Sequence, residues 1–150
     1  MEFSSQELKF MRREKYETLI RSQVLPGDIL LSKVGTIGNV CIFPDNYKEA
    51  ILSTTGSTRI RIDNNKMNTI FTAYNLLYIK TKLNKIASTG VQPFLNMSHV
   101  KDIDLIKPPL ELQNKFANFV IHVDKQKFEF EKQLKKLEEL QASLMQEYFG

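Results

Sequence analysis

The sequence has a single cysteine, Cys41, among 150 residues. One thiol excludes an intrachain disulfide framework and a multi-cysteine zinc site. Because so few cysteines are typical of proteins in a reducing compartment, we expect a cytoplasmic location. The sequence has only two histidines, His99 and His122, and its carboxylates form no recognisable pair or metal-ligand spacing. We therefore predict no catalytic residues, no metal ligands and no cofactor, and interpret the chain as non-enzymatic.

Long hydrophobic runs are also missing. No apolar stretch approaches the roughly 18 residues that a membrane-spanning helix needs. The first ten residues are polar and include Glu2 and Glu7, which is unlike a signal peptide. Hydrophobic residues nevertheless make up 42% of the chain and charged residues 25%, a globular composition. The length predicts one domain, or one domain with an appendage.

The excess of positive charge is unevenly distributed. Residues 1–108 contain 15 basic and 10 acidic side chains, whereas residues 109–150 contain 6 and 7. A basic zone within one module suits a polyanion such as DNA, because each neutralised phosphate releases a condensed counterion. A basic surface that serves solubility alone would show the same charge.

Periodicity predicts a mixed α+β domain. Short β-branched runs at 29–32, 39–43 and 58–62 are typical of strands, and a fourth is expected at 103–106. Helices are expected at 4–22 and from about residue 70 towards Ala87. The segment Gly35-Thr36-Ile37-Gly38 predicts a tight turn between two strands, since it lacks the phosphate-binding and dinucleotide-binding signatures. A GxxG loop of a KH RNA-binding module is an alternative, but it would require helices on both sides.

The last part of the chain predicts one long helix. No glycine or proline occurs from Leu110 to Tyr148. A helix of that length would extend roughly 58 Å, too far to cover its apolar stripe with the preceding domain. We therefore expect a helical partner, although a lone surface helix is the alternative. The predicted contact residues recur at heptad spacing: Phe116, Val120, Val123, Phe130, Leu134, Leu137, Leu144 and Tyr148.

Polar loops beside basic residues are the candidate DNA contacts. Hydroxyls, amides and guanidinium groups contact phosphates and read base edges, although each such cluster is also ordinary turn material. The Thr58–Ile62 strand alternates so that Arg59 and Arg61 share one face. The predicted DNA-contact residues are Lys33, Thr36, Ser53, Thr55, Ser57, Arg59, Arg61, Lys82, Lys85, Gln92 and Asn96.

Four motifs in order resemble one known family. Gly27-Asp28-Ile29-Leu30-Leu31-Ser32 and Gly35-Thr36-Ile37-Gly38 are similar to the GDILLS…GTIG signature of the target recognition domain in type I restriction–modification specificity subunits. Gly90-Val91-Gln92-Pro93-Phe94-Leu95-Asn96 resembles that family's G-x-x-Q loop. Ile106-Lys107-Pro108-Pro109-Leu110-Glu111-Leu112-Gln113 resembles its boundary between the domain and the long spacer helix.

The resemblance implies a partial target recognition domain at 1–107 and a spacer and dimerisation helix at 108–150. In that family, specificity subunits read double-stranded DNA without catalysis and dock methylase subunits, which bind S-adenosylmethionine. Restriction subunits are possible further partners. With one domain and one helix, the chain resembles half a subunit, so the resemblance predicts a homodimer through antiparallel C-terminal helices. Because early strands of the domain are expected to be absent, the alternative is a fragment that no longer reads DNA. Such a fragment would serve only as an assembly element or a recombination cassette.

Overall fold

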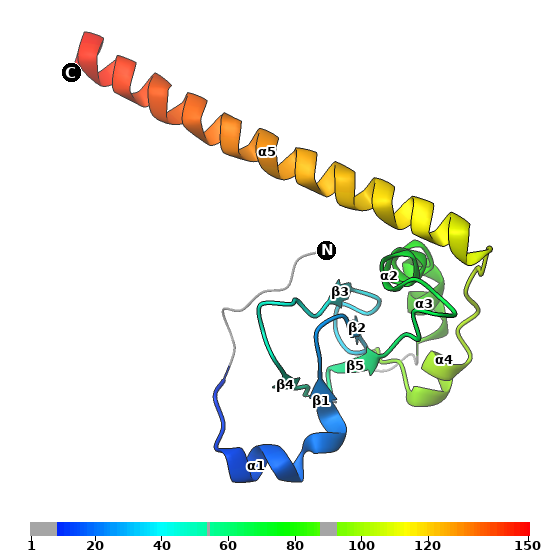
Figure 1. Cartoon of the computed structure of the whole chain (residues 1–150). Helices are drawn as coiled ribbons and strands as arrows, with labels where there is room; N and C mark the ends of the chain where they lie inside the picture. Colours follow the sequence, from blue (N-terminus) through cyan, green and yellow to red (C-terminus); the bar gives the residue numbers. More distant parts are fainter. Residues whose placement is uncertain (1–8, 54, 88–92) are drawn as a thin grey trace. The chain divides into compact units, whose positions relative to one another are not determined.

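The computed structural model describes residues 9–53, 55–87 and 93–150 (Figure 1). The chain divides into two compact units, Met1–Gln113 (unit 1) and Asn114–Gly150 (unit 2), and each is described by itself. The elements are, in chain order, α1 (Arg13–Thr18), the 3-10 helix η1 (Ile20–Ser22), β1 (Gln23–Val24), β2 (Ile29–Ser32), β3 (Val40–Ile42), β4 (Ala50–Ile51), β5 (Ser57–Ile60), α2 (Thr69–Tyr78), α3 (Lys80–Ile86), α4 (Met97–Lys101) and α5 (Leu110–Phe149).

A three-stranded antiparallel sheet is the centre of unit 1, with strand order β3-β2-β5. Ile29 pairs with Ile42 on one side and Ile60 on the other, and Leu31 pairs with Val40 and Thr58. Because side chains alternate along a strand, Ile29 and Leu31 share one face, and both are fully buried. A second, two-stranded sheet joins β1 to β4.

Helices α2 and α3 supply the other half of the hydrophobic core. Asn68 caps α2, because its side-chain oxygen accepts a hydrogen bond from the Phe71 N–H at 3.1 Å. The buried core cluster comprises Ile29, Leu31, Ile37, Val40, Ala73, Leu76, Leu83, Ala87 and Leu95. The sequence predicts one helix towards Ala87, but the structure has two, which meet at Ile79. Leu76 on α2 and Leu83 on α3 both reach the core.

Other predicted elements differ from the structure in specific ways. The strand expected at 103–106 is wrong: this segment has no regular structure, although Ile103 and Leu105 still pack against the core. In the described part of the N-terminal segment, the expected helix is reduced to α1 and η1. Helix α4 was not expected; Asn96 begins it by accepting a hydrogen bond from the His99 N–H at 2.8 Å. The strand predicted at 29–32 is confirmed with the same bounds, and those predicted at 39–43 and 58–62 are confirmed with ends shifted by one or two residues.

Helix α5 is continuous over 40 residues, as its lack of glycine and proline predicts. Within unit 2, every residue from 121 to 150 is exposed. The Lys127 Nζ atom lies 3.6 Å from the Glu131 Oε1 atom, and the Lys135 Nζ atom lies 4.0 Å from the Glu139 Oε1 atom. Both pairs have the i, i+4 spacing at which opposite charges stabilise an exposed helix. The predicted α+β class with a long C-terminal helix is confirmed. Within the described ranges, no helix is both long and apolar enough to cross a bilayer.

Candidate nucleic-acid interface

Three loops from distant parts of the sequence meet at one end of the central sheet. The Lys33 N–H donates to the Gly56 carbonyl at 2.8 Å, and the Leu95 N–H donates to the Lys33 carbonyl at 2.9 Å. An antiparallel β-bridge joins Val34 to Phe94 beside these bonds. We call this group the loop cluster and define it as residues 33–38, 53, 55–57 and 93–96. Backbone hydrogen bonds therefore hold three loop segments together at one end of the sheet.

The loop cluster contains six of the predicted DNA-contact residues, namely Lys33, Thr36, Ser53, Thr55, Ser57 and Asn96. The Ser53 and Thr55 hydroxyls are 3.0 Å apart and both residues are exposed. The Asn96 side-chain oxygen is occupied, since it caps α4 and accepts from the Ser98 hydroxyl at 2.6 Å. Gln92, also predicted, lies outside the described residues. The cluster also exposes the Phe94 ring, which the prediction did not include.

The Gly35–Gly38 segment is a turn between β2 and β3, as predicted, and both glycines have positive φ angles (71° and 80°). The KH alternative is therefore wrong, because strands rather than helices flank the turn. At Gly38 a Cβ atom would lie 2.8 Å from the Lys80 Cγ, so only glycine lets the turn pack this closely on α3.

Helix α3 borders the loop cluster through the same turn. The Asn84 amide donates to the Ile37 carbonyl at 3.2 Å, and the Lys80 ammonium donates to the Asn39 side-chain oxygen at 2.5 Å. Lys82 and Lys85 are exposed on α3, and the Lys82 ammonium lies 3.8 Å from the Asp104 carboxylate. Lys82 lies two residues after Lys80, so it projects from a different side of the helix. The two predicted lysines are thus neighbours of the cluster rather than members of it.

Arg59 and Arg61 lie away from the loop cluster along β5. The antiparallel register pairs Ser57 with Ser32 at the cluster end and Ile60 with Ile29 at the other end. With about 3.3 Å per residue, Arg61 follows Ser57 by roughly 13 Å. The Arg59 guanidinium donates to the Gln23 carbonyl. The sequence pattern placed both arginines on one strand, whereas the structure has Arg59 in β5 and Arg61 directly after its last residue, Ile60; their partners could not be read from the pattern.

Arg61 forms a bidentate ion pair with Asp28. Its Nε and Nη2 atoms lie 2.6 and 2.7 Å from the two carboxylate oxygens, and the Leu25 N–H donates to the same carboxylate at 2.8 Å. The Asp28 side chain is only 3% exposed, whereas that of Arg61 is 49% exposed. Burial alone would raise the pKa of Asp28, but the hydrogen bonds from Arg61 and Leu25 outweigh it and lower the pKa below its ordinary value.

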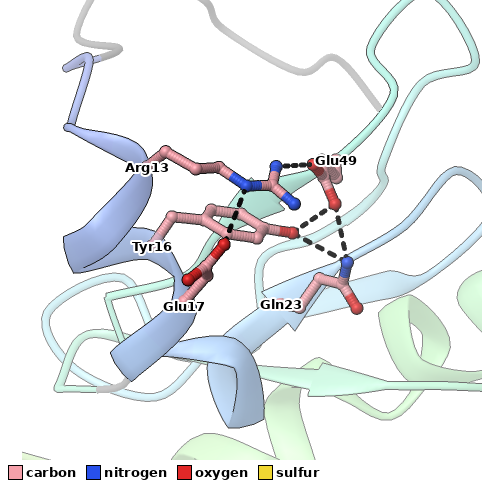
Figure 2. Close-up of polar contacts among 5 residues, drawn as sticks. All are labelled: Arg13, Tyr16, Glu17, Gln23 and Glu49. Carbon is pink, nitrogen blue, oxygen red and sulfur yellow. Dashed lines mark hydrogen bonds and ion pairs between the residues drawn. The ribbon is translucent and has the colours of Figure 1, made fainter.

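A second polar cluster joins α1 to the β1–β4 sheet (Figure 2). Glu49 accepts hydrogen bonds from the Tyr16 hydroxyl, from Gln23 at 2.8 Å and from Arg13 at 3.1 Å. The Arg13 guanidinium also lies 4.8 Å from the centre of the Tyr16 ring. These hydrogen bonds lower the pKa of Glu49, and the bond from the Tyr16 hydroxyl has the largest effect. Sequence reasoning missed the cluster because no local pattern links residues 33 positions apart.

Groups suited to catalysis are sparse in the described part of the chain. No three or more His, Cys, Asp or Glu side chains come together there in a way that could hold a metal ion. Cys41 is half-buried in β3, and burial raises the pKa of its thiol, which disfavours the reactive thiolate.

The predicted contact residues of α5 form an exposed apolar row. Seven of the eight are exposed, and Val120 is buried. Leu134, Leu137 and Leu144 expose 57%, 62% and 44% of their surface, although leucine is usually buried. We call Val123, Phe130, Leu134, Leu137, Leu144 and Tyr148 the apolar seam.

Comparison with known proteins identifies the family. The model of the type I restriction modification DNA specificity domain matches residues 17–141. A curated relative, the putative type I restriction enzyme MjaX specificity subunit of Methanocaldococcus jannaschii, is 26% identical over 148 residues, which cover 95% of this chain and 35% of the relative. A crystal structure of a type I restriction–modification system S subunit from M. genitalium is also similar, with a TM-score of 0.59 and 19% sequence identity. The match covers 83% of this chain and 32% of the M. genitalium chain, and it shows that the fold is shared. The chain thus spans about a third of each relative, and it belongs to the family of type I restriction–modification DNA specificity domains.

Proposed function

We propose that the chain is a non-catalytic DNA-recognition subunit of a type I restriction–modification system. Unit 1 contacts double-stranded DNA through the loop cluster, and α5 pairs with α5 of a second copy and docks methylase subunits. The observation that supports the DNA contact most is the convergence of three loops at one end of the sheet, held by the Lys33 backbone hydrogen bonds to Gly56 and Leu95. Preorganised loops on a rigid sheet suit base reading, since little order is lost on binding.

The chemistry of the loop cluster fits a duplex. Ser53 and Thr55 offer hydroxyls that donate or accept, Lys33 supplies positive charge, and Phe94 offers an apolar edge suited to a thymine methyl group. Lys82 and Lys85 would add phosphate contacts on the neighbouring helix. Arg59 and Arg61 remain candidate DNA contacts because a guanidinium has five N–H donors. Arg59 uses one donor in its bond to Gln23, and Arg61 uses two in its bonds to Asp28.

Replacing Arg59 tests base reading directly. The recognition sequence is first selected from random duplexes with the 150-residue chain and a methylase subunit present. If Arg59 reads a guanine, Arg59→Ala is expected to weaken cognate binding by about 1–3 kcal/mol and to relax one base position. Fluorescence anisotropy against cognate and scrambled duplexes measures both effects. Equal losses on the two duplexes would assign Arg59 to a phosphate or to the fold, through its bond to the Gln23 carbonyl.

Reversing the charge of Lys33 tests whether the loop cluster faces DNA. Each phosphate contact contributes about 0.9 to the slope of log K against log salt, or roughly eightfold in affinity at 0.1 M salt. Lys33→Glu is therefore expected to weaken binding at least about eightfold on all sequences and to reduce the slope by about 1. Lys66→Glu is the matched control, because Lys66 follows the opposite end of β5 and carries the same charge. An equal effect of both variants would show a diffuse charge effect instead of a directed surface.

Self-pairing through α5 would present two copies of unit 1 to DNA. A two-fold dimer requires a two-fold symmetric target, with both half-sites identical. Selection from random duplexes should therefore return an inverted repeat. A fragment that only assembles with protein partners is the competing function, which the long exposed helix alone would support. Saturable protein association without sequence-dependent DNA binding in the same titration would favour it.

A further inference from the structure

The backbone of the loop cluster fixes the side of the sheet on which the Phe94 ring lies. Phe94 pairs with Val34 in an antiparallel β-bridge, and the Leu95 N–H donates to the Lys33 carbonyl at 2.9 Å. Successive side chains in such an extended segment point to opposite faces. Leu95 is 2% exposed and belongs to the hydrophobic core. Phe94 therefore lies on the opposite face, which we call the outer face, and it is 45% exposed.

The outer face also carries polar side chains of β5. Ser57 and Arg59 alternate with Thr58, which is buried on the core face. Ser57 and Arg59 therefore share the outer face with Phe94. Phe94 pairs with residue 34 and Arg59 with residue 30, so their backbone positions are four residues, or roughly 13 Å, apart along the sheet. An aromatic ring, a hydroxyl and a guanidinium thus follow one another in a row.

The surroundings of Phe94 favour a particular chemical group on DNA. Lys33, Ser53 and Thr55 lie in the same loop cluster, and both hydroxyl residues are exposed. Such groups suit phosphates and polar base edges. An apolar ring among them suits the C5-methyl group of thymine, which is the apolar group that base edges present in the major groove. A ring that slid between base pairs would instead be indifferent to a single methyl group, because it stacks on any base.

We propose that Phe94 is a specificity-determining residue that contacts the methyl group of a thymine in the major groove. The inference rests on the proposed function, because it takes the loop cluster to face DNA. It requires an A·T pair in the recognition sequence. A row of roughly 13 Å laid along the groove spans about four base pairs, since each pair rises about 3.4 Å. Phe94 and Arg59 therefore read different base positions.

Deoxyuridine, which differs from thymidine by the methyl group alone, tests this contact. The recognition sequence is selected with the 150-residue chain and a methylase subunit present, and each thymine is then replaced singly. One replacement is expected to weaken binding of the parent about fourfold by fluorescence anisotropy, which corresponds to about 0.8 kcal/mol for a group of this size. Phe94→Ala should bind the thymine and deoxyuridine duplexes equally. Phe94→Gln should do the same, so either variant decides if the other fails to fold.

Met97→Ala is the matched control. Met97 is 46% exposed and lies only three residues after Phe94. Its sulfur atom accepts a hydrogen bond from the Thr58 hydroxyl at 3.6 Å, which ties it to a residue of the core face. Met97→Ala should therefore keep the fourfold preference for thymine. A preference that persists in Phe94→Ala, or that disappears in Met97→Ala instead, would overturn the inference.

The outcomes separate the inference from the proposed function. A parent chain that selects a sequence but tolerates deoxyuridine at every thymine would refute the inference alone, and this measurement needs no variant. A parent that selects no sequence would refute the proposed function and the inference together. Renewed selection should show that Phe94→Ala and Arg59→Ala relax different base positions. Relaxation of the same position by both variants would count against a direct contact by Phe94.

Discussion

Leu137→Lys is expected to convert a dimer into a monomer. Leu137 lies in the middle of the apolar seam and is 62% exposed in the single chain. Burying one such leucine contributes about 1.5–3 kcal/mol, and a two-fold dimer loses this twice. The substitution also places a lysine charge from each copy in an apolar contact. We expect the dissociation constant to rise at least about 100-fold, which corresponds to about 3 kcal/mol. Light scattering and sedimentation velocity at micromolar concentration measure the change.

Ser143→Lys is the control for this experiment. Ser143 is exposed on the same helix and immediately precedes the seam residue Leu144 in the chain, so its side chain points about 100° away from that of Leu144. The same lysine there should leave the dimer intact. A parent chain that remains monomeric at micromolar concentration would refute the pairing of α5. Equal weakening by both lysines would indicate a charge effect on association rather than loss of a packed seam.

Asp28→Asn is expected to destabilise unit 1 by about 2 kcal/mol, since a buried carboxylate loses its charged hydrogen bonds to a half-exposed arginine. For a domain of this size that corresponds to a fall of about 10 °C in melting temperature. Circular dichroism during heating measures the melting temperature.

Asp63→Asn is the control, because Asp63 is half-exposed and its ion pair with Lys66 lies at the surface. We expect a change within about 0.5 kcal/mol there.

The same carboxylate makes the stability of unit 1 dependent on pH. The folded-state pKa of Asp28 lies below its ordinary value of 3.8. Its contribution is therefore complete above the pKa of the unfolded state and is lost as pH falls through the folded-state pKa. The parent should lose more stability than Asp28→Asn when the pH is lowered from 5 to 3. Parallel pH profiles for the two proteins would show that Arg61 does not hold Asp28 in its charged form.

Local patterns in the sequence were sufficient for most of the regular structure. Short β-branched runs identified β2, β3 and β5, of which only β5 alternates, and the turn at Gly35–Gly38 followed from glycine spacing. Heptad spacing without a helix breaker identified α5. The expected strand at 103–106 failed because its apolar residues pack against the core from an irregular segment. Composition and periodicity do not distinguish such a segment from a strand, since both bury alternate side chains.

The loop cluster was predicted in part. Hydroxyls and basic residues pointed to the segments around Lys33 and Ser53, but nothing local indicated that these meet Phe94 and Leu95. Lys82 and Lys85 were grouped with the loops by their charge, whereas the structure sets them on the neighbouring helix. The polar cluster of Tyr16, Gln23 and Glu49 was missed altogether.

The long helix, the strands and the basic character of the first module follow from short-range rules, because backbone propensity and side-chain period act within a few residues. The pairing of Arg61 with Asp28, of Asn75 with Ile106 and of Gln113 with Asn68 follows from tertiary packing alone. A buried amide or carboxylate acquires its role from the groups that folding brings within hydrogen-bond distance. Those groups lie 31 to 45 positions away for Asp28 with Arg61, Asn75 with Ile106, and Gln113 with Asn68, a separation over which residue order carries no signal.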